Sequence, residues 1–235
     1  MEKAYKNIVL FFITITVIVF LGFYNTYFVF FPDFDKFKTF HHVHAIIMIL
    51  WLLVLIVQPI LINKRKYKWH RAIGKVSYVL VPVIVISMLI AYKYSFLTSI
   101  AEKGVAHSMS LNMLFLPLTD VLPFTTFYML AIINRKKVAS HFRYMISTAV
   151  VVVSAGLLRL LMTWLGMDFM GALYTSIVVM VLVFVSLIIY DFRNGKLKKN
   201  KSFLIALLIF SIPNLLLLFV PYTSWWRTFA EGLIN

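Results

Sequence analysis

The chain has 235 residues, of which 62% are hydrophobic and only 13% are charged, and its mean hydropathy is +0.93. This apolar content excludes an ordinary soluble domain and indicates a membrane protein with several spans. The formal net charge of +15 does not indicate nucleic-acid binding, because the basic residues are confined to particular loops. The sequence contains no cysteine, which excludes disulfides, iron–sulfur ligation and covalent haem attachment through a C-x-x-C-H motif.

Apolar runs dominate the sequence from end to end. A transmembrane helix needs about 20 mainly apolar residues to cross about 30 Å of hydrocarbon. Seven runs meet this requirement, at approximately 7–31, 40–62, 73–95, 105–133, 141–166, 171–190 and 202–220. Backbone polar groups in lipid have to be satisfied within each segment, so the runs are predicted to be helices. We therefore expect an all-α, polytopic membrane helix bundle that forms one domain over residues 1–235, with the first run retained as a helix and not cleaved as a signal peptide.

Basic residues are distributed unevenly among the loops. They concentrate at the N-terminus and in the second, fourth and sixth loops, within 64–75, 135–143 and 193–201. The other loops carry few basic residues, which Asp33 and Asp35 partly offset. The positive-inside rule therefore predicts a cytoplasmic N-terminus and an outer C-terminus, with Trp225 and Trp226 as interfacial anchors.

Six histidines lie near the starts of successive apolar runs. They begin the second run (His41, His42 and His44), the third (His70), the fourth (His107) and the fifth (His141). Because successive spans alternate in direction, His44 and His107 are predicted to share the outer face. His70 and His141 are predicted to share the cytoplasmic face. A histidine at a helix end is more often an interfacial or hydrogen-bonding residue than a ligand, and we favour that interpretation for His41 and His42.

Two charged residues are predicted to lie inside the membrane. Arg159 follows His141 by five complete helical turns, or about 27 Å, which predicts the same helix face and a position near the outer surface. A buried arginine there needs an anionic partner, and Asp168 or a haem propionate is expected to serve. Asp120 is predicted about 20 Å below His107, too far from Arg159 to pair with it. Asp120 is by default a functional intramembrane acid, or it caps a break in the helix between Pro117 and Pro123.

The histidine pattern resembles that of a known superfamily. Histidines on four consecutive helices, pairing second with fourth and third with fifth at opposite faces, look like the transmembrane di-haem b-type cytochromes, which include the ascorbate-reducible cytochromes. The resemblance covers about residues 40–166, which would form a four-helix cofactor core. The remaining helices, 7–31, 171–190 and 202–220, would flank it. It implies a transmembrane oxidoreductase that passes electrons across the bilayer.

The resemblance also implies the cofactors and their ligands. His44 and His107 would ligate an outer haem b, and His70 and His141 an inner one, or one haem alone would be present. Two axial imidazoles leave no open coordination position, which favours electron transfer. Gly74 would leave space for the macrocycle one turn after His70.

Arginines would complete the two haem sites. Arg71 and Arg143 would neutralise the inner propionates and attract a small anionic reductant, with a quinol as another electron donor, and Arg159 would supply positive charge at the outer site. The pattern His-Arg-x-x-Gly-Lys at 70–75 is also similar to uncharacterised bacterial multi-pass proteins. We therefore expect the bacterial inner membrane as the location.

Two other interpretations of these residues stay open. In the first, His41, His44 and His107 bind a single zinc, copper or iron ion at the outer face, because i,i+3 spacing lets two imidazoles converge. In the second, the protein binds no cofactor and is an accessory subunit of a larger membrane complex. Apolar helices in contact with lipids and a basic cytoplasmic surface would suffice for that role.

Overall fold

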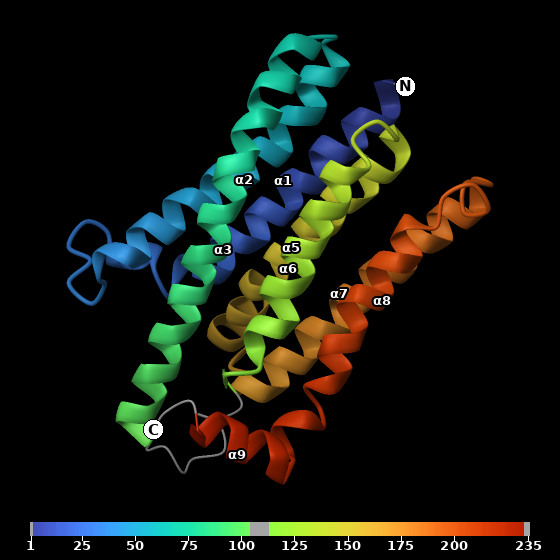
Figure 1. Cartoon of the computed structure of the whole chain (residues 1–235). Coiled ribbons are helices and arrows are strands. Elements are labelled where there is room, and N and C mark those ends of the chain that lie inside the picture. Colours follow the sequence, from blue (N-terminus) through green and yellow to red (C-terminus); the bar gives the residue numbers. More distant parts are fainter. Residues whose placement is uncertain (1, 104–112, 233–235) are drawn as a thin grey trace.

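The computed structural model describes residues 2–103 and 113–232, and its secondary structure is helical (Figure 1). The α-helices are α1 (Glu2–Tyr24), α2 (Thr39–Asn63), α3 (Tyr67–Lys103), α5 (Leu116–Ile133), α6 (Val138–Leu165), α7 (Phe169–Arg193), α8 (Ser202–Leu216) and α9 (Ser224–Gly232). Two 3₁₀ turns, η1 (Phe28–Phe30) and η2 (Val220–Tyr222), lie in the connections. No strand occurs in the part of the chain that the structure describes. The predicted all-α helix bundle is confirmed.

Seven described segments are long and apolar enough to cross a membrane, namely α1, α2, α3, α5, α6, α7 and α8 with the turn that follows it. This number agrees with the prediction, and the chain is an integral membrane protein. The fourth predicted span, 105–133, is not one continuous helix, because a turn at Leu114 and Phe115 precedes α5, which begins at Leu116. The predicted start at 105 lies outside the described residues. Pro117 lies in the first turn of α5, where a missing backbone N–H is tolerated.

Helix α6 lies at the centre of the bundle. It contacts α1, α2, α5, α7 and α8, and every residue from Ile146 to Ser154 is buried. A helix that is apolar around its whole circumference is expected to be central. The main core extends through the surrounding helices and includes one large aromatic side chain from each of α1, α2, α5, α7 and α8: Phe12, Trp51, Phe124, Phe184 and Phe210.

Helices α1 and α6 approach each other closely at two glycines. A Cβ atom added to Gly22 would overlap the carbonyl oxygen of Gly156, and one added to Gly156 would lie 2.7 Å from the Cα atom of Val19. Small residues allow the backbones of membrane helices to approach in this way. The indole nitrogen of Trp164 also donates a hydrogen bond to the carbonyl oxygen of Leu21 at 3.1 Å. A hydrogen bond and close backbone packing therefore both hold α1 against α6.

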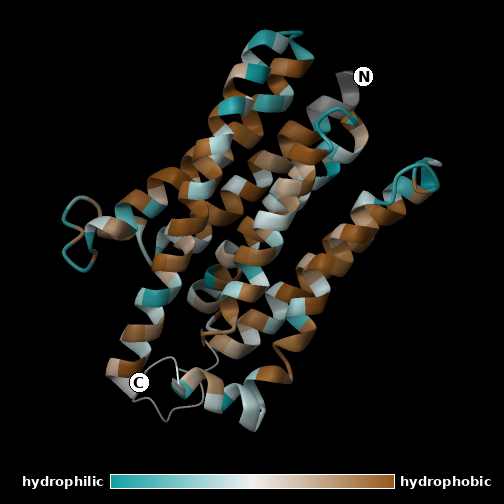
Figure 2. Ribbon diagram, viewed as in Figure 1, coloured by the Kyte–Doolittle hydropathy of each residue, from teal (hydrophilic) through white to brown (hydrophobic). Residues whose placement is uncertain are grey.

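The two ends of the bundle differ in chemistry. The loops between α2 and α3, α5 and α6, and α7 and α8 lie at the end where α1 begins, and they are strongly hydrophilic (Figure 2). We call this the basic end. The opposite end, which we call the aromatic end, carries exposed aromatic side chains that include Phe31, Trp164, Phe219 and Trp225. Aromatic side chains of this kind are enriched at the interface between membrane and water.

We predict that the basic end faces the cytoplasm. The chain contains no cysteine, so single cysteines can report which side of the membrane each loop occupies. Lys66→Cys and Asp33→Cys, both at exposed positions, should react with an impermeant maleimide from opposite sides of sealed vesicles. Lys136→Cys is a control that should follow Lys66→Cys. If Lys66→Cys and Asp33→Cys label from one side, the orientation and the pairing of histidines by height are both wrong.

Candidate functional site

The structure brings His70 and His141 together at the basic end. His70 lies in the first turn of α3 and His141 in the first turn of α6. The two imidazoles lie within electrostatic range of each other. Gln58 of α2 donates a hydrogen bond from Nε2 to the backbone oxygen of His70 at 3.3 Å. We call His70, His141 and Gln58 the inner site.

The two imidazoles of the inner site differ in hydrogen bonding. Nδ1 of His141 lies 2.8 Å from the carbonyl oxygen of Ala131. A carbonyl can only accept, so Nδ1 carries the proton and Nε2 of the neutral ring has a free lone pair. Within residues 2–103 and 113–232, Nδ1 of His70 and Oε1 of Gln58 are buried without a hydrogen-bond partner. Buried polar atoms in native proteins are normally paired, so these two atoms point to a missing ligand.

Open space lies beside His70. A Cβ atom added to Gly74 would have no heavy atom within 4 Å, and Gly74 follows His70 by one helical turn on the same side of α3. Further along this face, the Ser77 hydroxyl lies 2.8 Å from the Tyr128 hydroxyl. The indole nitrogen of the fully buried Trp51 has no partner in the part of the chain that the structure describes. Polar groups therefore lie next to the inner site, and α3 is not covered by neighbouring side chains at the partly buried Gly74.

Arg143 is occupied by a partner that the sequence did not reveal. Its Nε and Nη2 atoms donate to the two carboxylate oxygens of Asp191 on α7, each at 2.7 Å. Nη1 donates to the carbonyl oxygen of Ala139 at 2.8 Å. Both charged side chains are buried. A propionate would have to displace Asp191, so Arg71, which is exposed at the start of α3, is the better candidate for an anion at the inner site.

A second group of polar side chains lies between α2, α3, α5 and α6, nearer the aromatic end. We call it the outer polar cluster, and it consists of His44, Ser87, Tyr92, Asp120, Ser154 and Arg159. The Ser87 hydroxyl donates to the carbonyl oxygen of Ile84 at 2.7 Å and lies 2.9 Å from Nδ1 of His44. The serine oxygen therefore accepts from Nδ1, which leaves Nε2 of His44 free. His107, its predicted partner, lies outside the described residues.

Asp120 is the acid of this cluster. The Tyr92 hydroxyl donates to its Oδ2 atom at 2.5 Å. The Ser154 oxygen lies 3.4 Å from Oδ1, but its one hydrogen is donated to the carbonyl oxygen of Val151 at 2.7 Å. Within the described parts of the chain, the one ion pair shorter than 4.0 Å is that of Arg143 with Asp191. Asp120 is thus held by the Tyr92 hydroxyl and not by a cation in direct contact.

Arg159 supplies the positive charge near Asp120. Its guanidinium lies over the ring of Phe23, 4.4 Å from the centroid, and Nη1 donates to the carbonyl oxygen of Ala155 at 3.1 Å. It lies within electrostatic range of Asp120 and Tyr92. Arg159 and Asp120 thus form no direct ion pair, but they are close enough to interact electrostatically, which the predicted depth of Asp120 did not indicate.

Asp168, the other expected partner of Arg159, has a different role. It is the N-cap residue of α7, and its Oδ2 atom accepts hydrogen bonds from the backbone N–H groups of Met170 and Gly171, each at 3.0 Å. A carboxylate at this position also interacts favourably with the helix dipole. Its role is to start α7.

His41 and His42 make local contacts at the aromatic end. Nδ1 of His41 accepts from the backbone N–H of Lys38 at 3.0 Å. Nδ1 of His42 lies 2.6 Å from the Tyr27 hydroxyl, and partial burial raises the pKa of Tyr27 above its usual range, so the phenol stays protonated and donates. No group of three or more histidines and acids able to hold a metal ion occurs among the described residues, which do not include His107.

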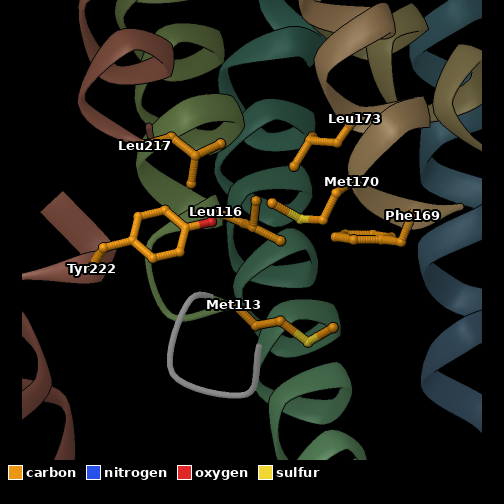
Figure 3. A pocket seen from close by; sticks show the side chains of 7 residues that line it. All are labelled: Met113, Leu116, Phe169, Met170, Leu173, Leu217 and Tyr222. Carbon is orange, nitrogen blue, oxygen red and sulfur yellow. The ribbon is translucent and has the colours of Figure 1, made fainter. Parts of the chain in front are cut away.

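Two hollows lie toward the aromatic end. The first is apolar (Figure 3) and is lined by Met113, Leu116, Phe169, Met170, Leu173, Leu217 and Tyr222. Its volume of about 10 Å³ is at the lower limit for one water molecule. The second is an open cleft of about 400 Å³. Its walls are Leu89, Tyr92, Lys93, Phe96, Leu97 and Ile100 of α3 with Met113, Leu114 and Pro117.

In comparisons with known proteins, no protein family, curated protein or solved structure matches the chain. The structure itself therefore defines the class: an all-α integral membrane protein with seven candidate spans. Its distinguishing features are a pair of histidines at the basic end and a partly buried network of ionisable side chains nearer the aromatic end.

Proposed function

We propose that the protein is a membrane-bound b-type cytochrome that transfers electrons across the bilayer. The observation that carries this proposal is that His70 and His141, from two helices far apart in the sequence, lie within electrostatic range of each other at the inner site. His141 is held through Nδ1 by the Ala131 carbonyl, the type of second contact that orients histidine ligands. His70 has a buried nitrogen without a partner among the described residues.

The surroundings of the inner site suit a haem. Open space at Gly74 would admit an edge of the macrocycle against α3. Arg71 is free to approach propionates, and guanidinium–carboxylate hydrogen bonds offset part of their desolvation. The lysines of the basic loops would attract a small anionic reductant or favour the approach of a quinol from the bacterial cytoplasmic membrane. When bound between two imidazoles, haem exchanges single electrons and leaves no position for oxygen.

The outer polar cluster supports a second haem less directly. His44 has a free Nε2 atom because Ser87 holds its Nδ1, and Arg159 lies within electrostatic range of it. His107 is the partner that the resemblance implies. Two haems near opposite faces would let electrons cross the membrane, whereas one haem would serve only one face.

Visible absorption spectra of the oxidised and dithionite-reduced protein test this function. Under the two-haem proposal, His70→Ala and His141→Ala should each remove about half of the reducible haem, because each axial ligand holds only its own cofactor. His44→Ala should remove the other half. His42→Ala is the matched control and should retain all of it, since the His42 ring is bonded to Tyr27.

Two results would contradict the proposal in different ways. Purified wild-type protein without any reducible haem would reject the cytochrome assignment. Unchanged haem in both inner variants, with loss in His44→Ala, would leave a single outer haem and no route across the full bilayer.

A further inference from the structure

The proposed electron transfer makes no use of Asp120. This acid lies within the membrane-spanning helix α5, where a charged group is costly and is by default functional. Its carboxylate is stabilised by the hydrogen bond from Tyr92 and by the more distant charge of Arg159. A carboxylate that has no cation in contact can gain a proton without breaking an ion pair.

Tyr92 connects this acid with the open cleft. Its side chain forms part of the cleft wall together with Lys93, while its hydroxyl donates to Asp120 at 2.5 Å. A cleft of about 400 Å³ has room for several water molecules, since each occupies about 30 Å³ of liquid. Asp120 and Tyr92 are each only partly buried by the described residues. The phenol therefore stands between the cleft and the carboxylate.

We propose that Asp120 is a proton-binding site that exchanges protons with the aqueous phase at the aromatic end through the Tyr92 hydroxyl. A hydronium ion in the cleft gives a proton to the Tyr92 oxygen as the phenol passes its own proton to Oδ2 of Asp120. The products are water, an intact phenol and a carboxylic acid. No electron moves in this step, so it needs no oxidant or reductant.

The side chains around Asp120 determine how a change in its charge affects the rest of the outer polar cluster. They are Tyr92 on α3, Ser154 and Arg159 on α6, and His44 on α2, which interacts with Arg159. Helix α8 also packs against α5, and its sequence has no ionisable side chain. Protonation of Asp120 would leave the charge of Arg159 uncompensated. In a low-dielectric interior, this change is transmitted to His44 much more strongly than it would be in water.

Infrared difference spectroscopy of the full-length protein in liposomes tests the proposal. On lowering the pH, wild-type protein should gain a carbonyl band of a protonated carboxylic acid, which shifts in deuterium oxide. Asp120→Asn should lose this band. Asp168→Asn is the matched control and should keep it, because Asp168 is an exposed N-cap.

The role of Tyr92 in proton transfer is tested with a variant that keeps the Asp120 carboxylate. Tyr92→Phe should retain the band but slow its hydrogen–deuterium exchange about tenfold, since the direct hydrogen-bonded path is lost. A wild-type exchange rate in Tyr92→Phe would overturn the route. Absence of the band from wild type, or its persistence in a folded Asp120→Asn variant, would overturn the proton site.

A folding defect does not prevent the test. If Asp120→Asn does not fold, Asp120→Glu replaces it and should move the band to a new frequency. A band unchanged in frequency would then overturn the assignment. The carboxyl band requires no haem, so these results and those of the haem spectra are independent.

Discussion

Asp191→Ala is expected to destabilise the protein by about 3–5 kcal/mol, because it leaves a charged Arg143 buried without its partner. Arg143 is only 8% exposed at its side chain and makes two charge-assisted hydrogen bonds to the carboxylate. The hydrogen bond to Ala139 and the ring of Phe203, 5.5 Å from the guanidinium carbon, cannot replace a negative charge. Thermal unfolding in detergent should show a large loss of midpoint temperature.

The double variant Arg143→Met, Asp191→Leu separates the buried charge from the lost volume. Replacing both partners of a buried ion pair with apolar residues is often neutral or stabilising, so the double variant should recover most of the loss. Asp168→Ala, which removes only a helix cap, should cost about 1 kcal/mol. A small effect of Asp191→Ala, equal to that of Asp168→Ala, would show that water or lipid headgroups reach Arg143.

Gly22→Ala is expected to destabilise the contact between α1 and α6 by about 1–3 kcal/mol, in the range for overpacking. The new methyl group would overlap the carbonyl oxygen of Gly156, and backbone atoms cannot rotate away as a side chain can. This loss should outweigh the helix propensity that alanine gains over glycine, about 1 kcal/mol.

Gly74→Ala is the control for that substitution. It makes the same chemical change within a helix, but its methyl group would meet nothing within 4 Å. Because Gly74 is also where the proposed macrocycle would lie, both variants are compared with wild type in the haem-free form, where the stability of Gly74→Ala should equal or exceed that of wild type. Equal behaviour of the two variants would mean that α1 and α6 are not in close contact in the membrane.

The spans could be predicted from sequence because membrane crossing depends on simple quantities. Length, apolar content and the need to satisfy backbone groups within a segment identify the helices without knowledge of their neighbours. The fourth span shows where this fails. Leu114 and Phe115 form a turn but are as apolar as the helix that follows, so hydropathy cannot reveal the break. Pro117 was the available signal, since proline favours the first turn of a helix.

The sites could be predicted only in part. The depth of a residue in the membrane can be estimated by counting residues along its helix. The rotation of the helix about its own axis, which decides the neighbours of each side chain, cannot be estimated in this way. Alternating spans were enough to predict that His70 and His141 share an end of the bundle. The partner of Arg143 depends on which faces of α6 and α7 meet, and Asp191 follows 48 residues later. The one available clue was the position of Asp191, which comes directly after an apolar run and before a basic loop.

The length of α3 has a mechanical consequence. Its 37 residues form a rod of about 55 Å, whereas the hydrocarbon layer is about 30 Å thick. Figure 1 shows it running from the loop after α2 to the level of α9. Such a rod adapts to bilayers of different thickness by changing its tilt. Tyr92 moves with α3 while Asp120 is fixed on α5, so lipid composition is expected to alter the hydrogen bond between them.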